Sequence, residues 1–243
     1  MTLGGGAEAA FGPAAVVFLL SLQILCELTH TTRTPDMLIG LFPLNIVLFP
    51  GSLYPLRIFE PRYKLLVRET IESNGTFGIN LVDQSKMANV GCLAKVEKVL
   101  HVYPDGKMEI VVAGTDRFRI GSYHSGDKPY LVAHVETFDD ETTQPPDFEL
   151  LESTIRLYNQ LAEVVYGEAE PLLDPSQWIT GGAAFRMGQK AGLELSLRQK
   201  MLEMLSEDER LLFLRQYLQE LVPKVKEYET MQMLSRNDGY LRE

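Results

Sequence analysis

The sequence predicts an α+β fold in which a small, partly closed β-barrel is followed by a helical bundle. Leu38–Phe138 contains many short runs of β-branched and aromatic residues, with a single helical pattern among them. From residue 148 onward, apolar residues recur at helical spacing instead. The chain has 243 residues, of which 45% are hydrophobic and 23% are charged, so it has the composition of a globular protein with a buried core.

The strand-rich part opens with Ile39–Phe59, which is rich in β-branched and aromatic residues. Pro43, Pro50 and Pro55 interrupt this stretch. Because proline has no N–H to donate to a β-ladder, these three positions predict strand ends, bulges or edges.

A single short helix is expected next. Glu60 is the candidate N-cap, and Pro61 suits the first helical turn, where its missing N–H costs nothing. Asn74-Gly75 should end this helix. Its apolar residues fall on one face and comprise Tyr63, Leu66, Val67 and Ile71.

The rest of the strand-rich part completes six or seven strands. Val90–Tyr103 alternates polar and apolar residues, with Val96, Val99 and Val102 among its apolar positions. Pro104–Lys107 is a tight-turn sequence, in which proline presets φ and glycine permits a positive φ, so Met108–Ala113 should return as the hairpin partner. The other predicted strands are Thr76–Val82, Arg117–Tyr123 and Tyr130–Phe138.

The second half of the chain is predicted to be helical. Ser176–Gly192 is expected to form one helix despite Gly181-Gly182. Ser196–Gln199 and Ser206–Glu209 resemble capping boxes, and the second should open the longest helix, which Pro223 should kink. We therefore expect four segments: a leader at 1–36, a β-barrel domain at 37–138, a polar linker at 139–147 and a helical bundle with a long last helix at 148–243.

The leader contains an apolar run at residues 14–26 that is too short to span a bilayer comfortably. No Lys or Arg precedes Arg33 and no clean small-residue cleavage motif follows the run, so a secretory signal is not indicated. Three interpretations stay open: a weak membrane or targeting element, an accessory helix, or translation that starts at Met37. We expect a cytoplasmic protein without a stable membrane span, and the segment at 14–26 is the alternative.

The charge distribution argues against a nucleic-acid partner. The net charge is −10, and residues 141–243 carry 11 basic and 18 acidic side chains, whereas phosphate binding needs clustered lysine and arginine.

The two cysteines, Cys26 and Cys92, form neither a disulfide framework nor a zinc site, which needs four closely spaced ligands. Cys92 is expected to be a small buried residue.

The sequence contains no pattern that indicates catalysis, and we expect no catalytic, cofactor-binding or metal-binding residues. It has neither a G-x-x-x-x-G-K-[ST] phosphate loop nor a G-x-S-x-G nucleophile elbow. Asp139-Asp140-Glu141 lies on the predicted linker, and a solvated linker does not hold two carboxylates at different pKa values.

Glu60 is expected to cap its helix while Arg62 pairs with a nearby carboxylate or carbonyl; a ligand-binding cluster with Tyr63 is the alternative. The four histidines lack metal-binding spacing, and His101 and His134 are expected to be structural or solvent-facing.

One stretch resembles a known family. FPLNIVLFPGSLYPLRIFEPRYKLLV (Phe42–Val67) is similar to the opening signature of the Lon protease N-terminal domain, and weaker blocks follow in the order of that family. They are FGINLV (Phe77–Val82), VGCLAKVEKV (Val90–Val99), PDGKMEIVVAGTDRFRI (Pro104–Ile120), KPYLVAHVE (Lys128–Glu136) and LRQKMLEMLSEDERLLFL (Leu197–Leu214). The resemblance covers about Met37 to Val225. It implies a PUA-like β-barrel followed by a helical bundle.

The resemblance also implies a non-catalytic substrate-binding module. In full Lon proteases this region helps to capture unfolded or tagged proteins and supports oligomerisation, and the ATPase and Ser-Lys peptidase follow it. We therefore expect binding of unfolded or degron-bearing proteins, or of a separate ATPase, protease or chaperone, without a cofactor. RNA or small-ligand binding by the barrel is the alternative, and a cryptic hydrolase is a third hypothesis.

A surface that accepts many sequences should offer flexible methionines and aromatic rings. An exposed strand edge, on which an extended peptide could pair, is a further possibility in the first half. Met231 and Met233 should either pack against a partner helix or be frayed. The candidate binding residues in the second half are Trp178, Phe185, Met187, Met201 and Met204.

Overall fold

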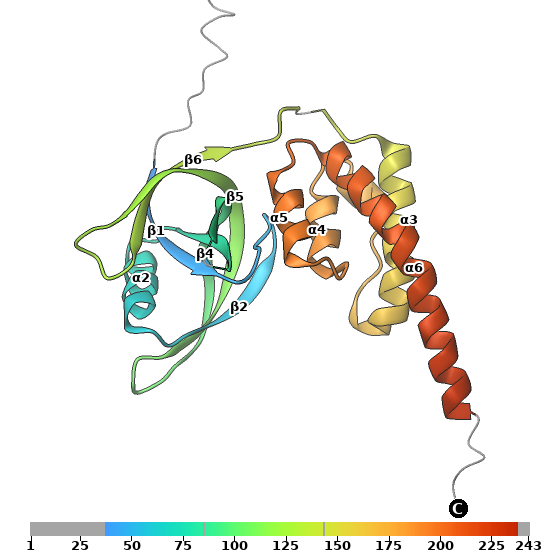
Figure 1. Ribbon diagram of the computed structural model, residues 1–243, viewed down its shortest axis with the longest axis horizontal. Coiled ribbons are helices and arrows are strands. Elements are labelled where there is room, and N and C mark those ends of the chain that lie inside the picture. Colours follow the sequence, from blue (N-terminus) through green and yellow to red (C-terminus); the bar gives the residue numbers. More distant parts are fainter. Residues whose placement is uncertain (1–36, 85, 143, 238–243) are drawn as a thin grey trace, which may run out of the picture. The chain divides into compact units, whose positions relative to one another are not determined.

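The computed structural model describes residues 37–84, 86–142 and 144–237. The leader at 1–36, with Cys26 and the apolar run at 14–26, lies outside them. Figure 1 shows the α+β architecture that the sequence predicts, with a strand-rich first half and a helical second half. The six strands are β1 (Met37–Leu44), β2 (Leu53–Ile58), β3 (Phe77–Asp83), β4 (Lys86–Val102), β5 (Met108–Ser125) and β6 (Leu131–Phe138).

The sheet closes on itself. Its strand order is β2-β5-β4-β3-β1-β6, and an additional β5–β6 pairing joins the far end of the sheet back to β5. Five strands thus form a ring, and β2 is attached to it along β5. The pairing of β1 with β3 is parallel, whereas the other pairings are antiparallel. The predicted small barrel of six or seven strands is therefore confirmed with six.

Strand β5 has 18 residues and pairs with two different strands along one of its edges. Its first part, Met108–Ala113, pairs with β2, and its later part, Arg117–Ser125, pairs with β6. Strand β4 follows the opposite edge of β5 from Val90 to Val102. The other edge of β4 pairs with β3 only as far as Ala94, which leaves the rest of β4 with a single neighbouring strand.

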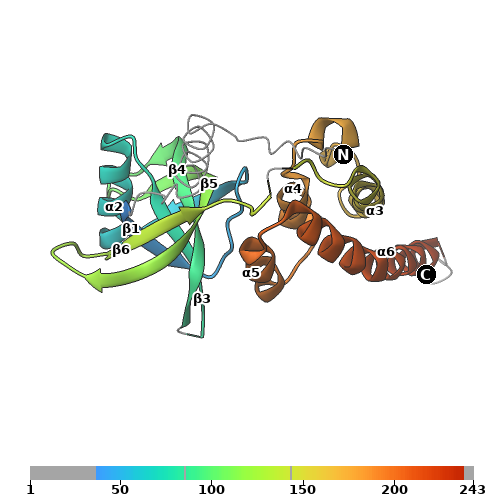
Figure 2. The same ribbon diagram turned by 90° about the horizontal axis from the view of Figure 1, so that it is seen from above.

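Helix α2 (Pro61–Glu72) packs on the outside of the barrel (Figures 1 and 2). Its contacts are with β3 and β4. Pro61 occupies the first turn as predicted, but the side chain of Glu60, at the N-cap, makes no capping hydrogen bond. Instead Glu60 pairs with Arg62 at 2.8 Å. Tyr63 is buried and stacks on Phe42 with ring centroids 3.9 Å apart.

The structure corrects one residue of the stripe predicted for α2. Leu66 and Val67 are buried in the barrel core, but Ile71 is 42% exposed at the end of the helix. The helix terminates at Ser73–Gly75, where Asn74 adopts a positive φ of 50° and turns the chain into β3. Cys92 is buried in the barrel as predicted, and burial raises the pKa of its thiol far above the usual range.

The helical half contains α3 (Phe148–Val165), α4 (Ala183–Lys190), α5 (Leu195–Glu203) and α6 (Glu207–Asn237), with 3-10 turns at Gly167–Ala169 and Pro175–Trp178. The single helix predicted over Ser176–Gly192 is wrong. Gly181 and Gly182 have φ values of 102° and 86°, a backbone region that α-helices exclude, so α4 begins only after them.

The last two helices begin at Leu195 and Glu207. Ser196 lies inside α5, whose N-cap is Glu194, so the capping box predicted there is wrong. Helix α6 begins directly after Ser206, where its start is predicted, and it continues through Pro223 to Asn237. Helix α3 is capped by Asp147, whose side chain accepts a hydrogen bond from the Leu150 N–H at 2.7 Å.

The core of the helical half extends into the barrel. Phe49, Leu81 and Val90 come from the strand-rich half and join the cluster that buries α3, α4, α5 and α6. Gly114 allows Phe49 to take this position, because a Cβ on Gly114 would lie 2.2 Å from the Phe49 carbonyl oxygen. Phe49 then stacks on Phe185 of α4, with ring centroids 5.2 Å apart.

Candidate functional site

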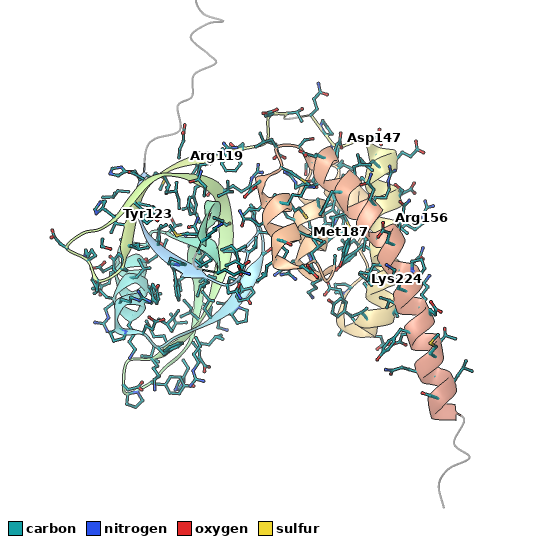
Figure 3. All side chains as sticks on the ribbon, viewed as in Figure 1. Arg119, Tyr123, Asp147, Arg156, Met187 and Lys224 are labelled. Carbon is teal, nitrogen blue, oxygen red and sulfur yellow. The ribbon has the colours of Figure 1, made fainter. Side chains whose placement is uncertain are left out.

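The structure places most of the predicted binding residues in the core. Phe185, Met187, Met201 and Met204 are all buried, and Met187 lies between the helices in Figure 3. Trp178 is partly buried, on the short turn before α4. The expectation of an exposed surface is therefore corrected for these four buried side chains, because α4 and α5 present their apolar faces to the barrel and to α6. Trp178 is partly accessible.

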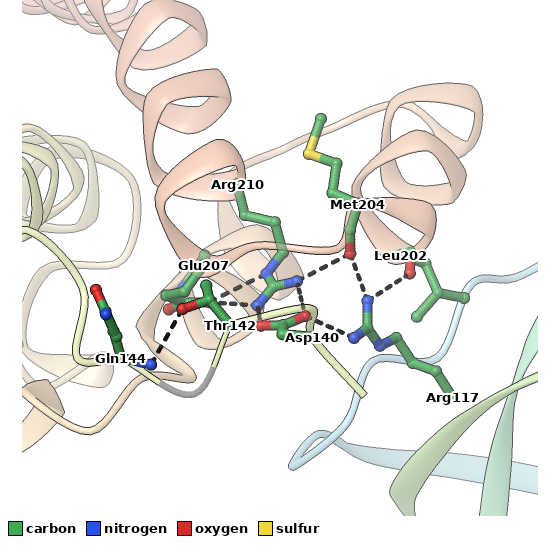
Figure 4. A network of polar contacts seen from close by, with 9 residues as sticks. Arg117, Asp140, Thr142, Gln144, Leu202, Met204, Glu207 and Arg210 are labelled. Carbon is green, nitrogen blue, oxygen red and sulfur yellow. Dashed lines mark hydrogen bonds and ion pairs between the residues drawn. The ribbon is translucent and has the colours of Figure 1, made fainter. Parts of the chain in front are cut away.

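The connection between the two halves holds a network of buried charges (Figure 4). The Arg117 guanidinium from β5 donates to Asp140 at 2.6 Å and to the backbone carbonyls of Leu202 and Met204 at 3.3 and 2.5 Å. Arg210 of α6 donates to the same Asp140 at 2.8 Å. We call Arg117, Asp140, Glu207 and Arg210 the junction network.

Glu207 completes this network. It accepts from Arg210 at 2.9 and 3.0 Å, and its second oxygen accepts the Ala184 N–H at the start of α4. Aromatic rings cover the charged groups, since Arg210 lies 4.4 Å from the ring centroid of Phe185 and Arg117 lies 4.6 Å from that of Phe138. Barrel, connection and helices therefore meet in a single set of paired charges.

The electrostatics of the junction favour the charged form of Asp140. Burial acts to raise the pKa of Asp140, but the hydrogen bonds and charges of Arg210 and Arg117 outweigh it, so the pKa lies below the ordinary value. Burial also lowers the pKa of Arg117, although an arginine stays protonated in a protein. The predicted solvated linker is thus wrong at Asp140, which is a paired ionic centre rather than a free carboxylate.

An apolar strip lies exposed at the other end of the barrel, along the β4–β5 hairpin. Val96, Val99 and Val102 stand opposite Val112, Ile110 and Met108 of β5, all three of which are buried. Val99 is 38% exposed and Val102 is 58% exposed, because β4 has no further strand beside it here. Leu100 and Ile71 of α2 are also exposed. We call Ile71, Val96, Val99, Leu100 and Val102 the apolar margin.

A hollow of about 170 Å³ lies between the end of α2 and this part of β4. The apolar margin contributes Ile71, Val96 and Val99 to its lining. The charged lining residues are Lys95, Lys98 and Glu97. The strand side of the hollow therefore alternates valines with charged side chains, and the hollow carries more positive than negative groups.

A second group of exposed apolar side chains lies on the last turns of α6 and comprises Tyr228, Met231, Met233 and Leu234. Tyr228, Met231 and Leu234 are spaced three residues apart and so lie along one side of the helix, whereas Met233 is offset from them.

Within the described residues, no group of three or more His, Cys, Asp or Glu side chains could hold a metal ion. Of the helices in this part of the chain, none is long and apolar enough to cross a membrane. Arg62 and Glu60 form an exposed ion pair, and the Arg62 guanidinium lies over the ring of the buried Tyr63. This agrees with the pairing expected for Arg62.

Comparison with known families assigns the chain. The ATP-dependent protease La (LON) substrate-binding domain matches residues 39–220, which is most of the sequence and includes both the apolar margin and the junction network. The chain belongs to the LON substrate-binding domain family.

Known relatives are Lon proteases that match over part of their length. The Lon protease of Parabacteroides distasonis is 30% identical over 131 residues, which cover 49% of this chain and 15% of the relative. That of Dictyoglomus thermophilum is 23% identical over 206 residues, which cover 79% of this chain and 25% of the relative. The chain thus spans a small part of the length of these proteases.

Solved structures share the LON substrate-binding fold. A Lon N-terminal domain protein from Xanthomonas campestris aligns with a TM-score of 0.58 at 25% identity, over 72% of this chain and 95% of that one. The N-terminal domain of Mycobacterium avium complex Lon protease aligns with a TM-score of 0.59 at 20% identity, over 75% and 98% of the two chains. The second likeness shows the fold alone.

The sequence contains only weak signals for the junction network and the apolar margin. Arg117 and Arg119 flank the buried Phe118 in one strand, and nothing in the sequence tells which arginine is buried. The spacing of Val96, Val99 and Val102 was a better signal, since three residues is not the two-residue period of a regular strand. That spacing indicates bulges, which the structure contains.

Proposed function

We propose that this LON substrate-binding domain binds unfolded or degron-bearing proteins through the apolar margin. The observation that carries the proposal is the exposure of Val99 and Val102, although their partners on β5, Ile110 and Met108, are buried. Family membership supports a substrate-binding module, and the margin is an exposed apolar surface within the described part of that module.

Unfolded proteins present the groups that such a surface can bind. Aliphatic and aromatic side chains that are buried in a native protein are exposed in its unfolded state, and their transfer from water onto the margin is favourable by about 25 cal/mol per Å² of apolar surface. A surface of valine, leucine and isoleucine makes no demand on hydrogen-bond pattern. It therefore suits a module that accepts clients of many sequences.

The margin is held in place by packed elements. The buried residues Ile110 and Met108 lie directly beside Val99 and Val102, and Lys64 of α2 donates to the Asp105 carbonyl at the hairpin tip at 2.9 Å. A preformed surface loses less conformational entropy on binding than a mobile one. This rigidity supports the proposal that the margin is a binding platform.

We further propose that a separate ATPase, protease or chaperone receives the bound client. Full Lon proteases carry an ATPase and a peptidase, whereas the family match of this chain covers the substrate-binding domain. Affinity capture from the native host should then recover an unfoldase or chaperone subunit together with client proteins. Clients recovered without such a subunit would contradict this part of the proposal.

The experiment that tests the binding site compares two sets of valine-to-threonine substitutions. Threonine keeps the β-branched shape and adds no charge. Val99→Thr with Val102→Thr should weaken the binding of a chemically unfolded, fluorescently labelled protein about tenfold, which corresponds to about 1.4 kcal/mol of lost apolar contact. Fluorescence anisotropy measures the affinity.

Val165→Thr is the matched control. Val165 lies at the end of α3, in the helical half, and is 51% exposed, so the same chemical change is made at a similar exposure. We expect wild-type affinity for this variant. Equal loss of affinity in the control and the double variant, or no loss in either, would contradict the proposed site.

A further inference from the structure

Strand β4 is irregular in the part that has a free edge, as its pairing with β5 on the opposite edge shows. Between Lys95 and Val102, eight residues of β4 lie opposite only six of β5, Met108–Ala113. The register shifts twice, between Val96 and Lys98 and between Val99 and His101, so Glu97 and Leu100 are extra residues at bulges. These bulges place Val96, Val99 and Val102 on one face, although they are three residues apart.

Such an edge is poorly suited to the addition of another strand. A β-ladder requires N–H and C=O groups that alternate regularly along the edge. The two bulges break this alternation, so no regular stretch between Lys95 and Val102 exceeds two residues. Bulges and lysines are also devices by which proteins keep exposed edges from pairing with other chains, and Lys95 and Lys98 both lie on this edge.

We propose that unfolded clients bind to the apolar margin through their side chains, without adding a strand to β4. This inference rests on the proposed function and deepens it. It replaces the strand-addition mode that the sequence suggested, in which main-chain hydrogen bonds supply the affinity. The bulged strand instead presents three valines in a row, and its free N–H and C=O groups do not alternate regularly.

The charges beside the margin define the client segment further. Lys95 and Lys98 line the hollow together with one carboxylate, Glu97. The charge balance at the hollow is therefore positive, although the chain as a whole carries −10. A client segment of aliphatic side chains with acidic neighbours complements both the valine row and the lysines.

The test uses three short labelled peptides of one aliphatic sequence. The first has aspartate flanks and an ordinary backbone. The second is identical but is N-methylated at alternate residues, on the edge that would pair with β4, so that it cannot donate ladder hydrogen bonds. The third has lysine in place of the aspartate flanks. Each is titrated into the wild-type chain and into the Val99→Thr, Val102→Thr variant, and anisotropy gives the affinity.

We expect the first two peptides to bind within about threefold of each other and the third to bind several-fold more weakly at low salt. Both acidic peptides should lose affinity in the valine variant. If N-methylation costs more than about tenfold while the valine variant still weakens binding, the side-chain mode is overturned and the proposed function stands. If all three peptides and the unfolded protein fail to bind the wild type, the proposed function is overturned and the mode with it.

Discussion

The junction network and the apolar margin use side chains in opposite ways. At the junction, Arg117 and Arg210 are buried and every charge is paired. At the margin, valines that face the same side as the barrel core are left exposed. Ordinary folding would bury the valines and expose the arginines.

This inversion indicates different roles for the two regions. Buried ion pairs contribute little net stability compared with apolar packing, but the loss of one partner is strongly destabilising. The junction thus holds β5, Asp140 of the connection, the end of α5 and the start of α6 in one arrangement. The margin gives up apolar burial within the chain, and that surface is available to a partner.

The largest expected effect is at the junction. Arg210→Ala removes the cation that pairs with Asp140 and Glu207 and leaves two carboxylates without their shared partner. We expect the free energy of unfolding to fall by about 3–5 kcal/mol. Urea denaturation followed by the fluorescence of Trp178, the single tryptophan, measures it.

Arg156→Ala is the control for this variant. Arg156 of α3 is exposed and pairs with Glu152 at 3.4 Å, a surface interaction worth less than about 1 kcal/mol. Similar losses of stability from the two arginine substitutions would show that the junction is not a special point of the fold.

A second test concerns the close approach of Phe49 to β5. In Gly114→Ala, the new Cβ would lie 2.2 Å from the Phe49 carbonyl oxygen, so the backbone must shift and the Phe49–Phe185 contact is disturbed. We expect a loss of about 1–3 kcal/mol in thermal or urea unfolding. Gly121→Ala, on the same strand, meets its nearest atom at an ordinary 3.5 Å and should cost clearly less.

The free energy of unfolding should depend on pH through the paired carboxylates of the junction and of the helical half. Asp140 has a folded-state pKa below its ordinary value, so its stabilising contribution is complete above about pH 4 and is lost as the pH falls through that lowered pKa. Glu170, whose pKa Lys190 and Arg186 lower against the effect of burial, behaves in the same direction.

Asp140→Asn isolates the contribution of the junction to this dependence. The variant should be less stable than the wild type near pH 7, and the difference between the two should narrow as the pH is lowered below about 4. Urea unfolding at a series of pH values gives the comparison. If the difference in the free energy of unfolding stays constant over that range, Asp140 does not contribute to the acid sensitivity of the fold.

The smallest expected effect is at the margin. Val99→Thr with Val102→Thr should change the free energy of unfolding by less than about 1 kcal/mol, since both side chains are already exposed in the folded chain. A large loss of stability would mean that these valines serve the fold rather than a partner. The comparison of the two regions would then fail.

Local chemistry explains how much of the fold the sequence predicted. Prolines, the Pro104–Lys107 turn and the change from strand-like to helical spacing are local signals, and they located the strands, α2 and the start of α6. The break at Gly181-Gly182 was missed because glycine is tolerated in a helix pattern, and only the positive φ angles reveal the turn.

The candidate site was less predictable because it depends on contacts between distant residues. Methionine and aromatic side chains suit both a core and a binding surface, so Met187 and Met201 could not be assigned from their type alone. Asp140 looked like part of a solvated acidic linker, and its two arginine partners lie 23 and 70 residues away. Exposure of the valines likewise follows from where the β3–β4 pairing ends.

The most direct test of the central claim is site-specific photocrosslinking. A benzophenone amino acid is placed at Val99, at Val165 or at Met231, and each protein is irradiated with the same unfolded, labelled protein. All three positions are exposed, so they differ mainly in location. The account predicts that crosslinked product forms mainly from position 99. Equal or greater yield from position 165 or 231 would contradict it.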